Sequence, residues 1–255
     1  MLVNQSLKSL SDNHSYPQVC LNASQDDQSF NEFKRNRVYT QILEHTTEEQ
    51  GAVYLNIISK CSSIIEAMPE FAKNDLYGNP IKFKFGDLGA ISPSTLRYVK
   101  VLMDLETYFG SLDGFDIAEI GCGYGGQCRI INTYFHPATY CLVDIKPALC
   151  LAQRFIDNFI IPSVMSYRTM NELEPRKCDL LISNYAFSEL PRVIQDVYLE
   201  KVVLNARRGY MTYNHINPAE FDSYSAEEIV RMIPGAKISP EEPLTYPGNC
   251  IVTWK

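Results

Sequence analysis

The residues with the clearest chemical meaning lie between Asp116 and Gln127, where a short apolar run ends in an acid and a cluster of glycines follows. The glycines occupy positions 121, 123, 125 and 126, directly after Glu119 and Ile120. Glycine adopts positive φ angles easily and leaves the backbone bare, so a ligand can lie directly against such a turn. If a helix begins behind the turn, its first amide groups point at the same ligand. The stretch therefore predicts a buried strand, a tight turn and a helix that together hold a cofactor.

Two classes of cofactor fit this turn. The spacing Gly121-x-Gly123-x-x-Gly126 satisfies the dinucleotide fingerprint of NAD(P)-dependent oxidoreductases. The spacing Glu119-x-Gly121-x-Gly123-x-Gly125 matches the first motif of class I methyltransferases that use S-adenosylmethionine (SAM), which the stretch resembles more. The late position of the turn in the chain and the lack of a following Tyr-x-x-x-Lys dyad argue against the oxidoreductase. A strand-turn-helix corner without a ligand is a third interpretation, but four glycines are costly unless something approaches them.

A second acid stands where the tip of the next strand is expected. Asp144 closes the apolar run 140–143 and lies 19 positions beyond Gly125 (144 − 125). A carboxylate at this strand tip can accept hydrogen bonds from both ribose hydroxyls of a bound nucleoside. Met170 follows the third predicted strand and could either cover one face of an adenine or pack in the core.

Three side chains beyond the later strands could take a proton from a substrate hydroxyl. His215 follows the fifth predicted strand, and its intrinsic pKa of about 6.5 suits a base at neutral pH. Glu189 follows the fourth strand and could act at the substrate site or cap the next helix. Tyr185 could orient the hydroxyl, relay its proton or simply pack. The four histidines are scattered without an accompanying acid cluster, so no metal site is expected.

These residues need a framework in which the strand tips meet at one edge. Apolar runs predict strands near residues 116–120, 140–143, 164–168, 179–183, 210–213 and 250–254. Helical patterns fill the segments between them. The alternation predicts an α/β fold with a doubly wound, mostly parallel sheet, whose ligands bind at the carboxyl ends of the strands.

The segment before residue 91 has a different character. Residues 1–32 are rich in Ser, Asn, Gln and Asp, and predict a polar arm that is disordered or folds onto a partner. Residues 33–90 predict a mainly helical cap, with one helix that begins at a capping box near Thr46 and ends at Pro69. The three positive charges of segment 33–37 form either a solvated helix face or a contact for a substrate phosphate or carboxylate. The cofactor domain is expected to span residues 91–255, and its first helix begins at Ser92-Pro93.

Composition narrows the classes of partner. The chain has 255 residues, a net charge of −7 and an isoelectric point near 5.2. Nucleic acids and anionic membranes are therefore not expected as main partners. No apolar stretch reaches the length of a membrane span, and the N-terminus has no secretory pattern, so we expect a cytoplasmic protein. The sequence is compatible with a homo-oligomer but does not predict one.

Three segments together resemble the putative sugar O-methyltransferase family of bacterial polysaccharide and glycosylated-metabolite pathways, within the class I SAM-dependent methyltransferases. They are Ser94-Thr95-Leu96-Arg97-Tyr98, the stretch from Glu119 to Gln127, and Ser183-Asn184-Tyr185-Ala186-Phe187-Ser188-Glu189. The resemblance covers roughly residues 33–255. It implies a Rossmann-like, seven-stranded sheet of class I methyltransferase type. It also implies a small-molecule substrate, either a free sugar or a nucleotide-sugar.

The resemblance also implies which residues bind the cofactor and the substrate. SAM would be the cofactor and S-adenosylhomocysteine the product. The implied cofactor residues are Glu119, Gly121, Gly123, Tyr124, Gly125, Gln127, Asp144, Ile145, Met170, Ser183 and Asn184. The implied substrate residues are Arg97, Tyr98, Tyr185, Ser188 and Asn214. A protein that binds SAM without catalysis is a further alternative.

Overall fold

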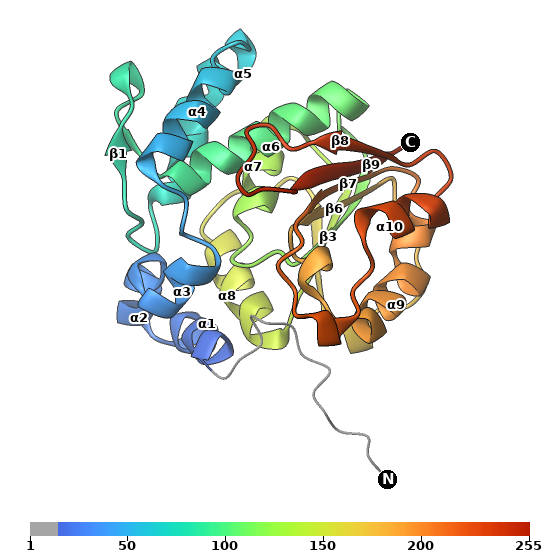
Figure 1. The fold of residues 1–255 in the computed structure, drawn as a ribbon. Helices are drawn as coiled ribbons and strands as arrows, with labels where there is room; N and C mark the ends of the chain where they lie inside the picture. The colour runs from blue at the N-terminus through green and yellow to red at the C-terminus, as the bar shows by residue number, and fades with distance from the viewer. Residues whose placement is uncertain (1–14) are drawn as a thin grey trace.

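The core of the molecule is a seven-stranded sheet in the computed structural model, which describes residues 15–255. The strand order is β5-β4-β3-β6-β7-β9-β8 (Figure 1). Strands β3 to β7 pair in parallel, whereas β9 runs antiparallel to both of its neighbours. The strands are β3 (Asp116–Ile120), β4 (Thr139–Val143), β5 (Val164–Arg168), β6 (Leu180–Asn184), β7 (Gly209–Tyr213), β8 (Lys237–Pro240) and β9 (Cys250–Trp254). This is a Rossmann-like, mostly parallel seven-stranded sheet, so the expected fold class is confirmed.

The register of the central strands brings their carboxyl ends to one edge. Ile120 on β3 is level with Val143 on β4, and Glu119 is level with Ile182 on β6. The chain proceeds from β3 to β4 on one side of the sheet centre and later to β6 on the other side. A crevice opens at such a reversal of strand order, directly outside the strand ends.

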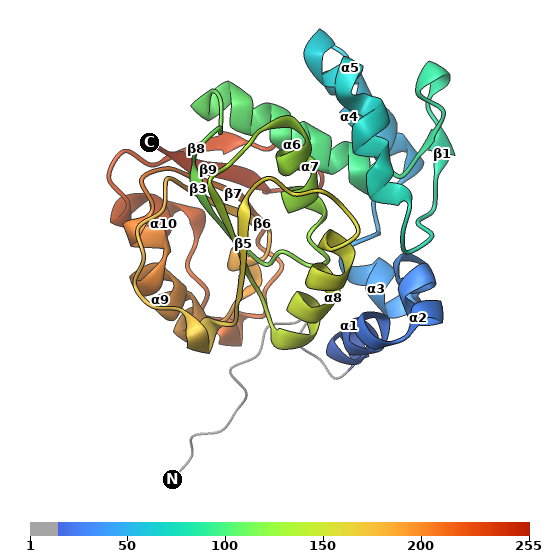
Figure 2. The same ribbon diagram turned by 180° about the vertical axis from the view of Figure 1, so that it is seen from behind.

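Helices cover both faces of the sheet. Buried residues of α6 (Pro93–Phe109), α7 (Gly126–Tyr134) and α8 (Lys146–Ile156) pack with Ile117 and Leu142 in one apolar cluster. Residues of α9 (Arg192–Lys201) and α10 (Ala226–Met232) pack with Ala118 and Val143 in the other. Figures 1 and 2 show the two sets on opposite sides. The alternation of side chains along each strand produces this two-sided core.

The polar arm expected for residues 1–32 differs from the structure over residues 15–32. These residues form α1 (Ser15–Gln25) and α2 (Asp27–Glu32). Tyr16, Cys20 and Ala23 are buried at helical spacing, and α1 packs beside α8 (Figure 2). The polar composition concealed this helix because only three residues of α1 form its buried stripe. The rest of the predicted arm, residues 1–14, lies outside the described residues.

The remaining part of the N-terminal segment is helical, as expected, but its divisions differ from the prediction. It contains α3 (Arg37–Ile42), α4 (Glu48–Ile58) and α5 (Ser62–Phe71), followed by a hairpin of β1 (Phe83–Lys84) and β2 (Ala90–Ile91). The single helix predicted up to Pro69 is therefore two helices, and Pro69 lies inside the second. Thr47 and Gln50 form the capping box of α4. Helix α4 packs against α6 (Figure 1).

Two further findings complete the architecture. The sequence did not predict strand β8. This strand lies at the edge of the sheet and most of its side chains are exposed, so its sequence contains no apolar run. A search of residues 15–255 finds no helix with the length and apolar character needed to cross a membrane.

Candidate functional site

A cavity of about 830 Å³ lies at the carboxyl ends of the parallel strands. Loops after β3, β4, β5, β6 and β7 line one side of it, and the N-terminal segment lines the other. Of the residues predicted to bind cofactor or substrate, the cavity wall includes Glu119, Gly121, Gly123, Asp144, Ile145, Met170, Asn184, Tyr185, Glu189, Asn214, Arg97 and Tyr98. The volume lies within the usual range of small-molecule pockets, about 300–1,000 Å³.

The backbone of the glycine turn lies very close to the neighbouring segments of the chain. Gly121, Gly123 and Gly125 have φ angles of +74°, +54° and +83°, in the region that favours glycine. The Gly121 amide donates a hydrogen bond to the Val143 carbonyl at 2.8 Å, which ties the turn to β4. A Cβ atom at Gly121 would lie 2.0 Å from Cβ of Ala186, and one at Gly123 would lie 2.8 Å from Leu43. A side chain at Gly121 would therefore displace the loop that carries Ala186, and one at Gly123 would push the Leu43 side chain aside.

Asp144 links the turn to the tip of β4. Its carboxylate accepts hydrogen bonds from the amide of Gly123 at 2.9 Å and from the amide of Ile145 at 2.8 Å. These bonds fix the carboxylate at the mouth of the turn, where it lines the cavity. The position agrees with that of an acceptor for nucleoside hydroxyls.

Glu119 is a buried acid at the floor of the cavity. It is only 2% exposed, and the hydroxyl of Tyr140 donates a hydrogen bond to it at 2.7 Å. Burial raises the pKa of Glu119 to about 8, and the nearby charge of Asp144 adds to the effect. The carboxyl group is therefore mainly protonated at pH 7 until a cation lies beside it.

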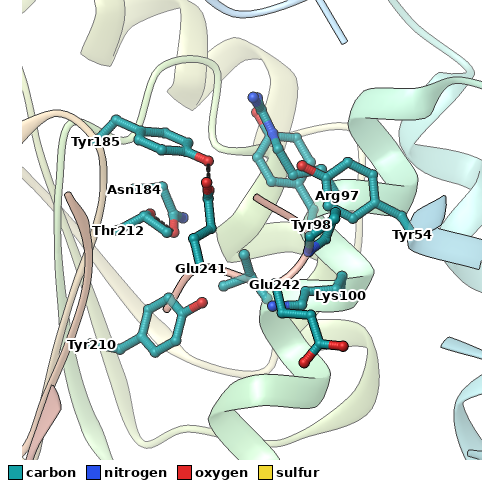
Figure 3. Close-up of a pocket in the computed structure, with 12 residues that line it drawn as sticks. Tyr54, Arg97, Tyr98, Lys100, Asn184, Tyr185, Tyr210, Thr212, Glu241 and Glu242 are labelled. Carbon is teal, nitrogen blue, oxygen red and sulfur yellow. Dashed lines mark hydrogen bonds between the residues drawn. The ribbon is translucent and has the colours of Figure 1, made fainter. Parts of the chain in front are cut away.

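The loop after β6 presents Tyr185 in an unusual backbone conformation. Its φ angle is +64°, which costs energy in any residue with a Cβ atom. The hydroxyl donates a hydrogen bond to Glu241, and burial, followed by the charge of Glu241, raises the pKa of Tyr185 (Figure 3). Asn184, directly before it, accepts a hydrogen bond from the hydroxyl of Thr212 at 3.2 Å. The loop is thus held from two sides.

Glu189 is the acid best placed to accept a proton. It lines the cavity, and the side-chain amide of Asn214 donates a hydrogen bond to it at 2.6 Å. Burial raises the pKa of Glu189 above its ordinary value, and the bond from Asn214 opposes the shift. Ser188 donates to the Asn214 side chain at 3.0 Å and so fixes that amide.

The structure does not bring His215 into the same site. Its side chain is exposed and is not part of the cavity wall. The ring lies 5.8 Å from that of Tyr213, outside the strand edge. Of the two predicted bases, Glu189 lines the cavity and His215 does not, so Glu189 is the base that we propose below.

Five residues predicted to bind ligand lie behind the cavity wall instead. Tyr124 is buried and accepts a hydrogen bond from Asn74 at 3.2 Å, and Gln127 donates to the carbonyl of Tyr98 at 3.2 Å. Ser183 donates to the Ile120 carbonyl and accepts from the Phe187 amide. The others are Gly125 and Ser188. These positions support the loops that carry the cavity residues.

The N-terminal segment, expected from the sequence as a cap, lines part of the cavity, but the sequence did not predict which of its residues would do so. Tyr16, Leu43 and Tyr54 line the cavity, with Val38, Gln41, Ile42, His45, Thr46 and Gln50. Asp144 acts on Tyr16 electrostatically, so α1 approaches the predicted ribose position. Only the apolar spacing of α1 and α4 could have signalled that these helices fold onto the domain, and spacing does not say where.

The charged segment 33–37 has no direct role in the cavity wall. Lys34 is buried, donates to the carbonyl of Asn74 at 2.8 Å and lies 4.2 Å from the centre of the Tyr124 ring. Arg35 donates to the carbonyl of Asn79 at 2.8 Å. Neither interpretation from the sequence describes Lys34, since it is buried and holds the segment to the domain.

Comparisons with known proteins give structural likeness only. No family model matches the sequence, and no curated protein matches it. Among solved structures, magnesium protoporphyrin IX methyltransferase from Synechocystis PCC 6803, with bound SAM, has a TM-score of 0.45 and 15% identity, over 62% of this chain and 81% of that one. A SAM-dependent methyltransferase from Mesorhizobium loti has a TM-score of 0.43 and 13% identity, over 59% and 95%. A Thermoplasma acidophilum protein has a TM-score of 0.43 and 13% identity, over 63% and 89%.

Proposed function

We propose that the protein is a SAM-dependent O-methyltransferase that methylates a sugar hydroxyl. One observation carries this proposal: the cavity combines a bare glycine turn with the buried acid Glu119 on one strand and the acid Asp144 at the tip of the next. An acid beneath the turn suits an ammonium group, and an acid at the second tip suits ribose hydroxyls. The turn itself has no room for side chains at Gly121 or Gly123.

The residues that would hold SAM are therefore Glu119, the glycine turn and Asp144. When bound, SAM supplies an activated methyl group. Asn184, the last residue of β6, and Tyr185, the next residue, also line the cavity and would face the methyl group and its acceptor. Their fixed loop would align the acceptor and exclude water, effects that contribute several kcal/mol in enzymes of many kinds.

Glu189 would accept the proton of the acceptor hydroxyl as the new bond to carbon forms. A neutral alcohol is a poor nucleophile, and a positioned base contributes roughly 10²–10⁴-fold to the rate. The raised pKa of Glu189 brings its basicity closer to neutral pH, which favours proton transfer. Asn214 would orient the carboxylate, because it donates directly to it.

The sugar assignment rests on the resemblance of three sequence segments and on the lining of the acceptor side. Tyr54, Tyr98 and Tyr185 line that side and combine ring faces with hydroxyl groups. Such side chains can pack on the apolar face of a sugar ring while their hydroxyls meet its polar groups.

Calorimetry with SAM, S-adenosylhomocysteine and NAD tests the cofactor. Saturable binding of the first two, and not of NAD, supports the proposal. Binding of NAD but not SAM would make the protein an oxidoreductase instead. Mass spectrometry of sugars and nucleotide-sugars incubated with protein and SAM then tests the acceptor class. Binding of SAM with no methylated product from either class would contradict the sugar assignment.

A further inference from the structure

Arg97 lies in the wall between two spaces. It stands near the start of α6 and lines both the large cavity and a smaller one of about 20 Å³ beside it (Figure 3). Tyr54, Tyr98, Asn184 and Tyr185 line both spaces as well. The smaller space holds about one water molecule, so any larger group must reach Arg97 from the large cavity.

The guanidinium group of Arg97 is only partly satisfied by the protein. It donates to the carbonyl of Leu43 at 3.2 Å and lies 5.6 Å from the centre of the Tyr98 ring. Among residues 15–255 it has no carboxylate within ion-pair distance, whereas buried Lys100 is paired with Asp104 at 2.7 Å. Arginine carries five N–H donors, so several remain for a ligand.

Two acids lie near Arg97 without forming an ion pair with it, Glu241 and Glu44. Glu241 is 6% exposed and accepts hydrogen bonds from the Tyr185 hydroxyl and from the amide and hydroxyl of Thr245. Burial raises the pKa of Glu44, and the nearby charge of Lys34 opposes that shift. Neither carboxylate forms an ion pair with Arg97, although the charge of Glu44 acts on it electrostatically. The guanidinium therefore keeps N–H donors for an anion in the cavity.

We propose that Arg97 binds an anionic group of the substrate, either a carboxylate on the sugar or a phosphate attached to it. This inference rests on the proposed function and narrows its substrate class to an acidic sugar or a nucleotide-linked one. The planar guanidinium suits both anions because it can donate two parallel hydrogen bonds to either. The surrounding tyrosines would hold the sugar next to that anion and close to Tyr185, on the acceptor side of the glycine turn.

Two matched ligand pairs test the proposal on the full chain saturated with S-adenosylhomocysteine. The pairs are glucuronate against glucose, and uridine diphosphate against uridine, with binding followed by ligand-observed NMR. We expect the anionic member of at least one pair to bind more tightly, and the pair that discriminates identifies carboxylate or phosphate. Arg97→Gln should weaken binding of that anion by about 10- to 100-fold and leave its neutral counterpart unchanged. Arg97→Lys should retain part of the affinity because the charge remains.

Arg37→Gln serves as the matched control. Arg37 is an exposed arginine of the same N-terminal segment and is not part of the cavity wall, so this variant should bind every probe normally. Melting temperature and S-adenosylhomocysteine affinity confirm that each variant is folded. Failure of S-adenosylhomocysteine to bind would overturn the proposed function itself. Normal binding of that cofactor product, with no preference for either anion or a preference that survives in Arg97→Gln, would overturn the Arg97 proposal alone.

Discussion

Replacement of Glu119 by Gln tests whether the buried acid meets the cationic end of the cofactor. With a pKa of about 8, Glu119 carries a proton in about nine molecules out of ten at pH 7. A cation bound beside it favours the ionised form, so binding should expel that proton. We therefore expect SAM binding to release up to one proton per site at pH 7 from the native protein, and less from Glu119→Gln.

The same pKa fixes how affinity depends on pH. Ionisation of Glu119 at pH 7 costs on the order of 1 kcal/mol, since pH 7 lies below the pKa of about 8. SAM is expected to bind the protein in which Glu119 is ionised. The fraction of ionised Glu119 rises with pH, so the SAM affinity of the native protein should rise about fivefold from pH 7 to pH 8. A hydrogen bond to a charged group is worth about 1.5–3 kcal/mol, so Glu119→Gln should lose at most about tenfold in affinity at pH 7 and more at pH 8.

Calorimetry in buffers of different ionisation enthalpy measures both quantities. Gln keeps an acceptor for the hydroxyl of Tyr140, so the fold should survive. The native protein should also lose unfolding free energy as the pH rises from the ordinary glutamate value through about 8, since burial disfavours the ionised form, and the variant should not. Equal affinity and equal proton release in the two proteins would refute the assignment of Glu119 to the cofactor.

The other expected outcomes concern the neighbouring positions. Asp144→Ala should lower SAM affinity by at least about tenfold in calorimetry, because it removes a charged acceptor and the bond that fixes the Gly123 amide; unchanged affinity in a folded variant would exclude Asp144 from the site. Glu189→Gln should slow turnover about 10²–10⁴-fold, while His215→Ala should stay near normal; the opposite result would restore His215 as the base. The acidic limb of kcat/KM should lie above the ordinary glutamate pKa, since activity is lost as the pH falls through the raised pKa of Glu189. A chain that begins at residue 91 should bind no SAM, because the N-terminal segment forms part of the cavity wall; normal binding would show that this wall is dispensable.

The sequence by itself predicted six of the seven strands of the central sheet and the residues proposed to bind the cofactor. Continuous apolar runs, strand-end acids and glycines at fixed spacing are local signals, because each depends on residues close together in the chain. Glu119, Gly121, Gly123 and Asp144 were all found in this way, and all four line the cavity. The register of parallel strands then leaves little freedom in where their tips lie.

The tertiary structure alone decided which residues line the part of the cavity proposed for the methyl acceptor. His215 and Glu189 both follow strands in the sequence, and only the path of their loops separates an exposed histidine from an acid in the cavity. The same holds for Tyr16 of α1, since a helix with three buried residues gives no sign of which surface it will cover. Contacts between segments far apart in the chain depend on packing rather than on local pattern. For that reason the sequence could not show that Lys34 is buried and bonded to the carbonyl of Asn74, or that Arg97 lines the cavity.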